Sequence, residues 1–304
     1  MRVLLVDDDP VSLRLLEATV ASFGHAADTR RDGEAAWAAF ESSPYDVVIS
    51  DRDMPGISGV DLCRRLRAHE AGRRAYVVIL TGRDQRQDVL DGMAAGADDY
   101  LTKPLQVDDL QLRMIAAART TELHVQLEEA TSALRVAART DPLTGVRNRL
   151  AMQEDLQLLH DRVTRYGGKY CLALVDVDHF KAFNDTYGHL AGDEALRQIA
   201  SRLRGTSRSG DAVYRFGGEE FVCVLPEQLL GTAAIALERM RANVANLGME
   251  HSGNASGVVT ISAGVVCSGS ADRRTPEQLL AAADLALYRA KEGGRDRVEL
   301  ETAS

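Results

Sequence analysis

The sequence predicts two α/β domains joined by one long helix. Three observations support this architecture. The first 120 or so residues alternate short apolar runs with amphipathic segments, residues 105–139 contain neither glycine nor proline, and the remainder combines apolar runs ending in carboxylates with a glycine hairpin. A chain of 304 residues with 45% hydrophobic content can also form two ordinary cores.

The N-terminal region predicts a parallel sheet covered on both faces. Apolar runs at 3–6, 47–50 and 76–80 have the composition of buried strands, and residues 35–40 and 62–67 show helical spacing between them. Acidic residues follow two of these strands, namely Asp7, Asp8 and Asp9 after the run at 3–6 and Asp51 after the run at 47–50. Asp9 precedes Pro10 and has a structural explanation as a helix N-cap. Asp7 and Asp8 have no such explanation.

Residues 1–119 resemble a response-regulator receiver domain, which implies a flavodoxin-like fold with a five-stranded parallel sheet. The resemblance makes Asp51 the phosphoacceptor for a cognate sensor histidine kinase. It implies an Mg²⁺ ion held by Asp7, Asp8, Asp51 and the carbonyl of Asp53, because an aspartate that attacks phosphorus needs a cation to screen the approaching charges. The residues implied at the phosphoryl group and the switch are Thr81, Lys103 and Tyr100. A half-buried strand tyrosine is the alternative for Tyr100.

Residues 120–140 are predicted to form a coiled-coil linker. Leu123, Leu127, Ala130, Leu134 and Ala137 follow 4-3-4-3 spacing. A helix that packs on its own receiver domain explains the chain to about residue 118, and the remaining heptads predict a parallel homodimer.

A hairpin in the second half predicts a metal-bound nucleotide. Residues 215–221 have the sequence RFGGEEF, with Gly217 and Gly218 beside Glu219 and Glu220. Glycines let the backbone approach an anion, and adjacent carboxylates would repel that anion unless a divalent cation lay between them. The sequence therefore predicts Mg²⁺, although a hairpin closed by solvated glutamates is the alternative.

The second half resembles the GGDEF family of diguanylate cyclases. The resemblance rests on the hairpin, on LVDVD at 174–178, on DPLTGVRNR at 141–149, and on ADLALYRAK at 283–291 with Gly294 and Arg295. It implies a palm-like α+β domain at 141–304 that joins two GTP into cyclic di-GMP within a homodimer. The implied Mg²⁺ ligands are Asp176, Glu220 and the carbonyl of Val177, with Glu219 and Arg215 as further catalytic groups. The implied GTP-binding residues are Asn184, Asp193, Lys181, Gly217, Gly218, Lys291 and Arg295.

A product site is predicted just before the hairpin. Arg208 and Asp211 match the family's R-x-x-D inhibitory motif at the family's offset from Gly217, and Arg239 or Arg241 could contribute a second arginine. An alternative function is a degenerate domain that senses GTP or cyclic di-GMP. The retained carboxylates favour the enzyme.

Charge, hydrophobic pattern and cysteine spacing argue against nucleic-acid binding, membrane insertion and a disulfide framework. The net charge of −9 argues against a broad nucleic-acid or anionic-membrane surface, and no apolar run approaches the ~20 residues that span a bilayer. Cys63, Cys171, Cys223 and Cys267 form no C-x-x-C pair, which predicts reduced structural thiols in a cytoplasm.

Overall fold

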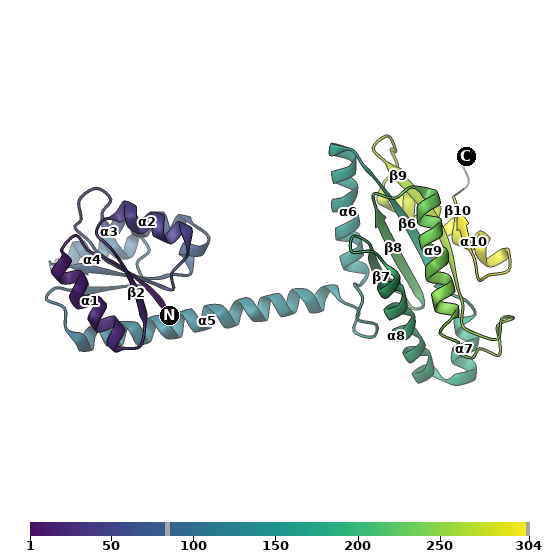
Figure 1. Cartoon of the computed structure of the whole chain (residues 1–304), viewed down its shortest axis with the longest axis horizontal. Coiled ribbons are helices and arrows are strands. Elements are labelled where there is room, and N and C mark those ends of the chain that lie inside the picture. The colour runs from purple at the N-terminus through teal and green to yellow at the C-terminus, as the bar shows by residue number, and fades with distance from the viewer. Residues whose placement is uncertain (83–85, 302–304) are drawn as a thin grey trace. The chain divides into compact units, whose positions relative to one another are not determined.

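The computed structural model describes residues 1–82 and 86–301, and it contains two compact units, Met1–Ser132 and Ala133–Ser304 (Figure 1). The first unit has the predicted alternation of strands and helices. Its elements are β1 (Arg2–Val6), α1 (Pro10–Ser22), β2 (Ala26–Arg30), α2 (Gly33–Ser42), β3 (Val47–Asp51), α3 (Gly59–Ala68), the 3₁₀ turn η1 (Ala71–Arg73), β4 (Tyr76–Thr81), α4 (Arg86–Ala94), β5 (Asp99–Thr102) and most of α5 (Val107–Arg139).

The predicted parallel five-stranded sheet is confirmed. Its strands lie in the order β2-β1-β3-β4-β5, and every pair is parallel. Successive side chains of a strand point to opposite faces. Thus Val3 and Leu5 pack with α1 and α5, whereas Leu4 and Val6 pack with α2 and α3. Both faces are therefore buried, and the strand ends that carry Asp7 and Asp51 meet at one edge.

The long helix is confirmed as α5, and Leu110, Met114 and Ala117 bury its first turns against the receiver sheet. The prediction that packing on this unit ends near residue 118 is wrong. Val125 helps line a cavity of about 260 Å³ beside Tyr45, and Glu128 pairs with Arg74 at 2.8 Å. The sequence pattern could not show this, because these contacts come from loops at the far end of the sheet.

The second unit has a mixed sheet flanked by helices. The sheet has the order β10-β9-β6-β8-β7, in which β6 lies antiparallel to both of its neighbours. The elements after α5 are α6 (Arg149–Tyr166), β6 (Lys169–Val177), α7 (Phe180–Tyr187), α8 (His189–Thr206), β7 (Ala212–Gly217), β8 (Glu220–Pro226), α9 (Leu230–Ala245), β9 (Ile261–Gly269), α10 (Pro276–Glu292) and β10 (Val298–Leu300).

Two apolar clusters cover the two faces of this sheet. Cys171, Ala173 and Val175 point toward α7, α8 and α9, while Leu172 and Leu174 point toward α6 and α10. The central strand β6 is thus buried along its length. It places Asp176 and Val177 at the carboxyl end of a rigid strand. Among the described residues, no helix is long and apolar enough to cross a membrane.

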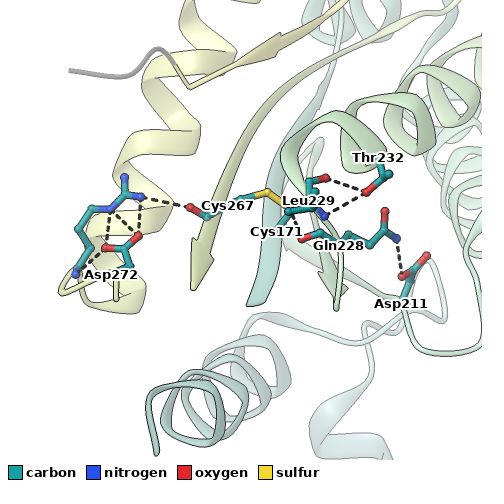
Figure 2. The surroundings of a disulfide bond; sticks show 8 residues. Cys171, Asp211, Gln228, Leu229, Thr232, Cys267 and Asp272 are labelled. Atoms are coloured by element: carbon teal, nitrogen blue, oxygen red, sulfur yellow. Dashed lines mark hydrogen bonds and ion pairs between the residues drawn. A yellow bond between two sulfur atoms is a disulfide. The ribbon is translucent and has the colours of Figure 1, made fainter. Parts of the chain in front are cut away.

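The prediction that all four cysteines are reduced is wrong in this structure. Cys171 and Cys267 form a disulfide across β6 and β9 (Figure 2), whereas Cys63 and Cys223 are free and buried. The bonded residues are 96 positions apart in the chain. The antiparallel register of the two strands sets them directly opposite each other. Sequence spacing carries no information about that register.

Candidate functional site

The first candidate site is a carboxylate cluster at the receiver edge. Asp7, Asp8 and Asp51 each place a carboxylate oxygen within 4.8 Å of the others. Asp7 and Asp51 are buried and Asp8 is exposed. Asp9, by contrast, caps α1 through Val11 and Ser12, as predicted. The structure therefore brings together the three carboxylates predicted for Mg²⁺.

Lys103 is the cation of this cluster. Its Nζ lies 2.8 Å from Asp7 Oδ2 and 3.0 Å from Asp51 Oδ1. Burial raises the pKa of Asp51 above its ordinary value despite the opposing effect of Lys103. The pKa of Lys103 is also raised, because its bonds to the two aspartates outweigh the effect of burial. A buried acidic cluster with one lysine fits a divalent cation, which would add the missing positive charge.

The remaining receiver residues surround this edge. Thr81 is buried at the end of β4, and Asp53 lies in the turn after β3 with an exposed side chain. Tyr100 on β5 is 38% exposed and borders a small cavity with Thr81. Asp99 of β5 and Arg113 of α5 pair with each other within the chain at 3.1 Å.

The second candidate site lies where β6 ends beside the β7–β8 hairpin. Asp176 of β6 stands directly opposite Glu220 of β8, and Glu219 and Gly218 form the hairpin tip. Gly218 has φ +51°, a conformation that favours glycine, and a side chain at Gly217 or Gly218 would extend into open space. The hairpin therefore offers accessible backbone next to two facing carboxylates.

Asp176 is held in an unfavourable environment for a negative charge. The residue is 7% exposed, and burial raises its pKa to about 6, with Glu219 and Glu220 adding to the shift. Lys291 of α10 opposes it, with Nζ 3.0 Å from Asp176 Oδ1. A buried carboxylate that faces a second carboxylate fits Mg²⁺, and the residues that would hold it are Asp176, Glu220 and the carbonyl of Val177.

Arg215 contacts both the hairpin tip and the segment at the start of the domain. Its guanidinium donates to both carboxylate oxygens of Asp141, at 3.0 and 3.2 Å, and to the Gly218 carbonyl at 2.7 and 3.0 Å. Asp141 also accepts from Thr144, and these bonds lower the pKa of Asp141 despite burial. Arg215 thus joins the hairpin tip to the turn of the DPLTG segment. These bonds fix its guanidinium at the hairpin tip, and the catalytic role of Arg215 stays a prediction.

Asn184 and Asp193 come from the consecutive helices α7 and α8. Gly192 lets these helices approach, because a β-carbon there would lie 1.9 Å from Asn184 Oδ1. That oxygen is buried and has no hydrogen-bond partner among the described residues. A buried oxygen without a partner is available to accept a hydrogen bond from a bound ligand. Lys181 is exposed on α7, and Arg295 follows α10.

Two further residues position the site, and sequence reasoning missed the first of them. His251 is fully buried. Its Nδ1 accepts from the Gly253 amide, so its Nε2 donates to the His179 carbonyl at the start of α7. Asp178 is also buried and accepts from Thr260, Ser262 and the amide of the residue after Arg295. A lone histidine in a loop gave no signal, whereas the carboxylate run at 176–178 indicates a hydrogen-bonding role for Asp178.

The predicted product site is an exposed turn before β7. Asp211 Oδ2 accepts from the Arg208 amide at 2.9 Å, and the Arg208 side chain is exposed. Arg239 is exposed on α9, where it borders a groove of about 890 Å³ between α8 and α9. Arg241 pairs with Glu238 and Asp296 and is the less available of the two candidates.

Comparisons with known proteins identify both domains. The family described as "Diguanylate cyclase, GGDEF domain" matches residues 138–297, and "Response regulator receiver domain" matches residues 3–115. The chain belongs to the GGDEF diguanylate cyclase family. Its N-terminal unit is a receiver domain.

Individual relatives cover different parts of the chain. "Response regulator PleD" of Caulobacter vibrioides is 34% identical over 98% of this chain, which spans 65% of that relative's length. "Diguanylate cyclase DgcP" of Pseudomonas aeruginosa is 44% identical over 58% of this chain and 25% of the relative. The coiled coil and GGDEF domain of DgcB from Caulobacter crescentus, solved with c-di-GMP, is 32% identical, with a TM-score of 0.57 over 62% of this chain and 98% of that one.

The charge on Asp176 gives the GGDEF domain a testable pH dependence. Between the ordinary value of 3.8 and about 6, the folded state holds a proton that the unfolded state has lost. The stability contributed by Asp176 therefore falls as pH rises through this window. In metal-free buffer, we expect the stability advantage of Asp176→Asn over the wild type to grow by about 1 kcal/mol between pH 5 and 7.5.

Native-state hydrogen exchange of the β6 amides measures this difference. Adding Mg²⁺ at pH 7.5 should then stabilise the wild type and leave Asp176→Asn unchanged. Equal pH profiles for the two proteins would contradict the assigned state of Asp176.

Proposed function

We propose that the chain is a cytoplasmic, phosphorylation-regulated diguanylate cyclase that converts two GTP into cyclic di-GMP and two pyrophosphates within a homodimer. The observation that carries the proposal is the facing pair of carboxylates, Asp176 and Glu220, beside the glycine hairpin tip. A domain that only sensed a nucleotide would not need this metal-binding pair. DgcB, a relative of this domain, was solved with c-di-GMP.

Each GGDEF domain binds one GTP in the proposed reaction. Asn184 and Asp193 contact the guanine base, since a carboxylate can accept from guanine N1–H and the exocyclic amine whereas adenine offers no such pair of donors. Gly217 and Gly218 give the phosphates access to backbone amides, and Lys181, Lys291 and Arg295 supply positive charge. Lys291 already neutralises Asp176, so it is placed to exchange that partner for a phosphate.

The chemistry is a double phosphoryl transfer. The 3′-oxygen of each GTP forms a bond to the α-phosphorus of the other, the bond from that phosphorus to pyrophosphate breaks, and each hydroxyl proton passes to solvent. Bound Mg²⁺ would neutralise charge on the phosphates. Arg215 keeps the hairpin tip in place through Asp141, and Glu219 lies at the tip beside the reacting groups.

A homodimer is required because one GGDEF domain presents only half of this reaction. The linker leucines Leu123, Leu127 and Leu134 are 64%, 65% and 69% exposed in the single chain. Burying such a regular seam favours a parallel coiled coil.

We expect Leu127→Asp to be monomeric at concentrations where the wild type is dimeric, because it places a charge in the seam. Its cyclase activity should be lost over the same range of protein concentration. Leu158→Asp is the matched control, since Leu158 is 69% exposed on α6 and outside the seam. Light scattering measures the oligomeric state of both variants. A dimeric Leu127→Asp variant would show that the linker seam does not hold the dimer together.

The receiver domain controls the dimer in this proposal. A sensor histidine kinase phosphorylates Asp51, with Mg²⁺ held by Asp7, Asp8, Asp51 and the Asp53 carbonyl. Lys103 and Thr81 bind the phosphoryl oxygens. Tyr100 changes its side-chain conformation when Asp51 is phosphorylated. Since Lys103 contacts both Asp7 and Asp51, a phosphoryl group would compete for it directly. These changes at β4 and β5 favour a receiver dimer that aligns the two cyclase domains. Alignment raises the effective concentration of one bound GTP near the other and fixes their orientation.

Product feedback acts at the Arg208–Asp211 turn. Arg208 can hold a phosphate or the guanine Hoogsteen edge with its planar guanidinium, and Asp211 can accept from the Watson–Crick edge. Arg239 of the second domain would complete the site. A product that links two domains in this way keeps their GTP molecules apart, so inhibition should not compete with GTP.

We expect Arg208→Ala to weaken product inhibition by about tenfold or more while basal turnover stays normal, because it removes charge-assisted hydrogen bonds of about 1.5–3 kcal/mol. Initial rates at increasing cyclic di-GMP measure the change. Arg204→Ala removes another exposed arginine nearby and should retain inhibition. Unchanged inhibition in Arg208→Ala would place the product elsewhere.

A further inference from the structure

The disulfide between Cys171 and Cys267 lies next to the predicted product site (Figure 2). Cys171 is fully buried in β6, and its Sγ lies 3.3 Å from the carbonyl oxygen of Gln228, in the loop between β8 and α9. The Gln228 side chain reaches Asp211, with Nε2 3.4 Å from Oδ1. Asp211 in turn accepts from the Arg208 amide. A continuous path thus runs from the sulphur pair to the R-x-x-D turn.

We propose that Cys171 and Cys267 form a reversible disulfide, and that its oxidation state is transmitted through Gln228 to the Arg208–Asp211 turn. Reduction breaks the covalent link between β6 and β9, so Cys267 no longer fixes the position of Cys171 Sγ. Because this sulphur contacts the Gln228 carbonyl oxygen, a shift of the Cys171 side chain moves the loop between β8 and α9.

The surroundings direct this movement toward Gln228. On the far side, the Cys267 carbonyl accepts from Arg274, which is held by Asp272 and Glu301. Gln228 is 4% exposed, and its Oε1 is buried without a hydrogen-bond partner among the residues described. The long bond to Asp211 is thus a weak restraint on this amide, and a small shift of the loop can break it.

The oxidation step uses a small-molecule disulfide such as oxidised glutathione. Cys267 is the more exposed cysteine of the pair, and its thiolate attacks one glutathione sulphur and displaces the other as a thiolate. The Cys171 thiol then attacks Cys267 Sγ, its proton passes to the departing glutathione sulphur, and reduced glutathione is released. The two protein thiols lose two electrons, which the glutathione disulfide gains.

The other two cysteines do not compete for this chemistry. Burial raises the pKa of Cys63 to about 11 and that of Cys223 to about 12, so both remain protonated at neutral pH. They therefore serve as internal controls for thiol mapping.

The first measurement maps thiols on the full-length protein after equilibration with oxidised or reduced glutathione. After unfolding in iodoacetamide, peptide mass spectrometry should find a Cys171–Cys267 link in the oxidised sample, with Cys63 and Cys223 alkylated. All four cysteines should be alkylated in the reduced sample. Four alkylated cysteines in both samples would overturn the disulfide.

The second measurement tests the relay without any nucleotide. Hydrogen exchange of the peptide spanning 204–214 should be faster in the reduced protein, by on the order of fivefold at the Arg208 amide. Cys267→Ser should exchange at the reduced rate under both conditions, and Cys63→Ser should keep the difference. Equal rates in the two states of the wild type, or a difference that persists in Cys267→Ser, would overturn the relay.

The consequence for feedback rests on the proposed function. Calorimetry should show cyclic di-GMP binding about fivefold more weakly to the reduced protein, within the usual range of allosteric coupling. If cyclic di-GMP binds neither state while the exchange difference is present, the product-site assignment fails and the relay stands.

Discussion

The Glu220→Gln variant should form cyclic di-GMP on the order of 10³-fold more slowly than the wild type, or not at all. The substitution keeps the shape of the side chain and removes one of the two facing charges proposed to bind Mg²⁺, and such a loss is worth several kcal/mol of transition-state stabilisation. Glu220 begins β8 opposite Asp176 and is only partly buried, so the fold should be retained. Pyrophosphate release from GTP measures the rate.

Glu227→Gln is the matched control for this result. Glu227 is an exposed glutamate after the other end of β8, and its neutralisation should leave turnover unchanged. Circular dichroism and light scattering should show the same fold and oligomeric state for both variants. A near-normal rate in Glu220→Gln would remove Glu220 from the metal site.

The Asp51→Asn variant should not respond to a phosphoryl mimic such as beryllofluoride, whereas the wild type should be activated by on the order of tenfold. Asp51 is the residue that contacts Lys103 at the end of β3, and an amide cannot accept the phosphoryl group. Turnover and oligomeric state, each measured with and without the mimic, give the result.

Asp53→Asn tests the assignment of the neighbouring carbonyl. The Asp53 side chain is 77% exposed, and only its backbone oxygen is proposed to bind Mg²⁺, so this variant should remain responsive. Full activation of Asp51→Asn would mean that the phosphoacceptor lies elsewhere.

The architecture could be predicted from the sequence because its signals are periodic. Buried parallel strands appear as continuous apolar runs, and an uninterrupted helical pattern predicted α5 to within its first turn. The carboxylates at strand ends could be predicted for the same reason, since the edge of a sheet gathers residues that are far apart in the chain.

Register and loop contacts could not be predicted in this way. The Cys171–Cys267 bond depends on how two antiparallel strands align, and the pairing of Arg74 with Glu128 depends on where a loop ends. Arg215 shows a further limit: its position beside the glycines predicted a catalytic role, and the motif could not show that its guanidinium pairs with Asp141, 74 residues earlier. Motifs indicate which residues meet at a site, and tertiary contacts decide what each one does there.

Incubation of the purified full-length protein with GTP and Mg²⁺ tests whether it is a diguanylate cyclase. Chromatography of the nucleotides and an assay for pyrophosphate should show two pyrophosphates released for each cyclic di-GMP formed, with none of either after Mg²⁺ is chelated. GTP that binds tightly and is recovered intact would contradict the account, because it would make this GGDEF domain a nucleotide sensor.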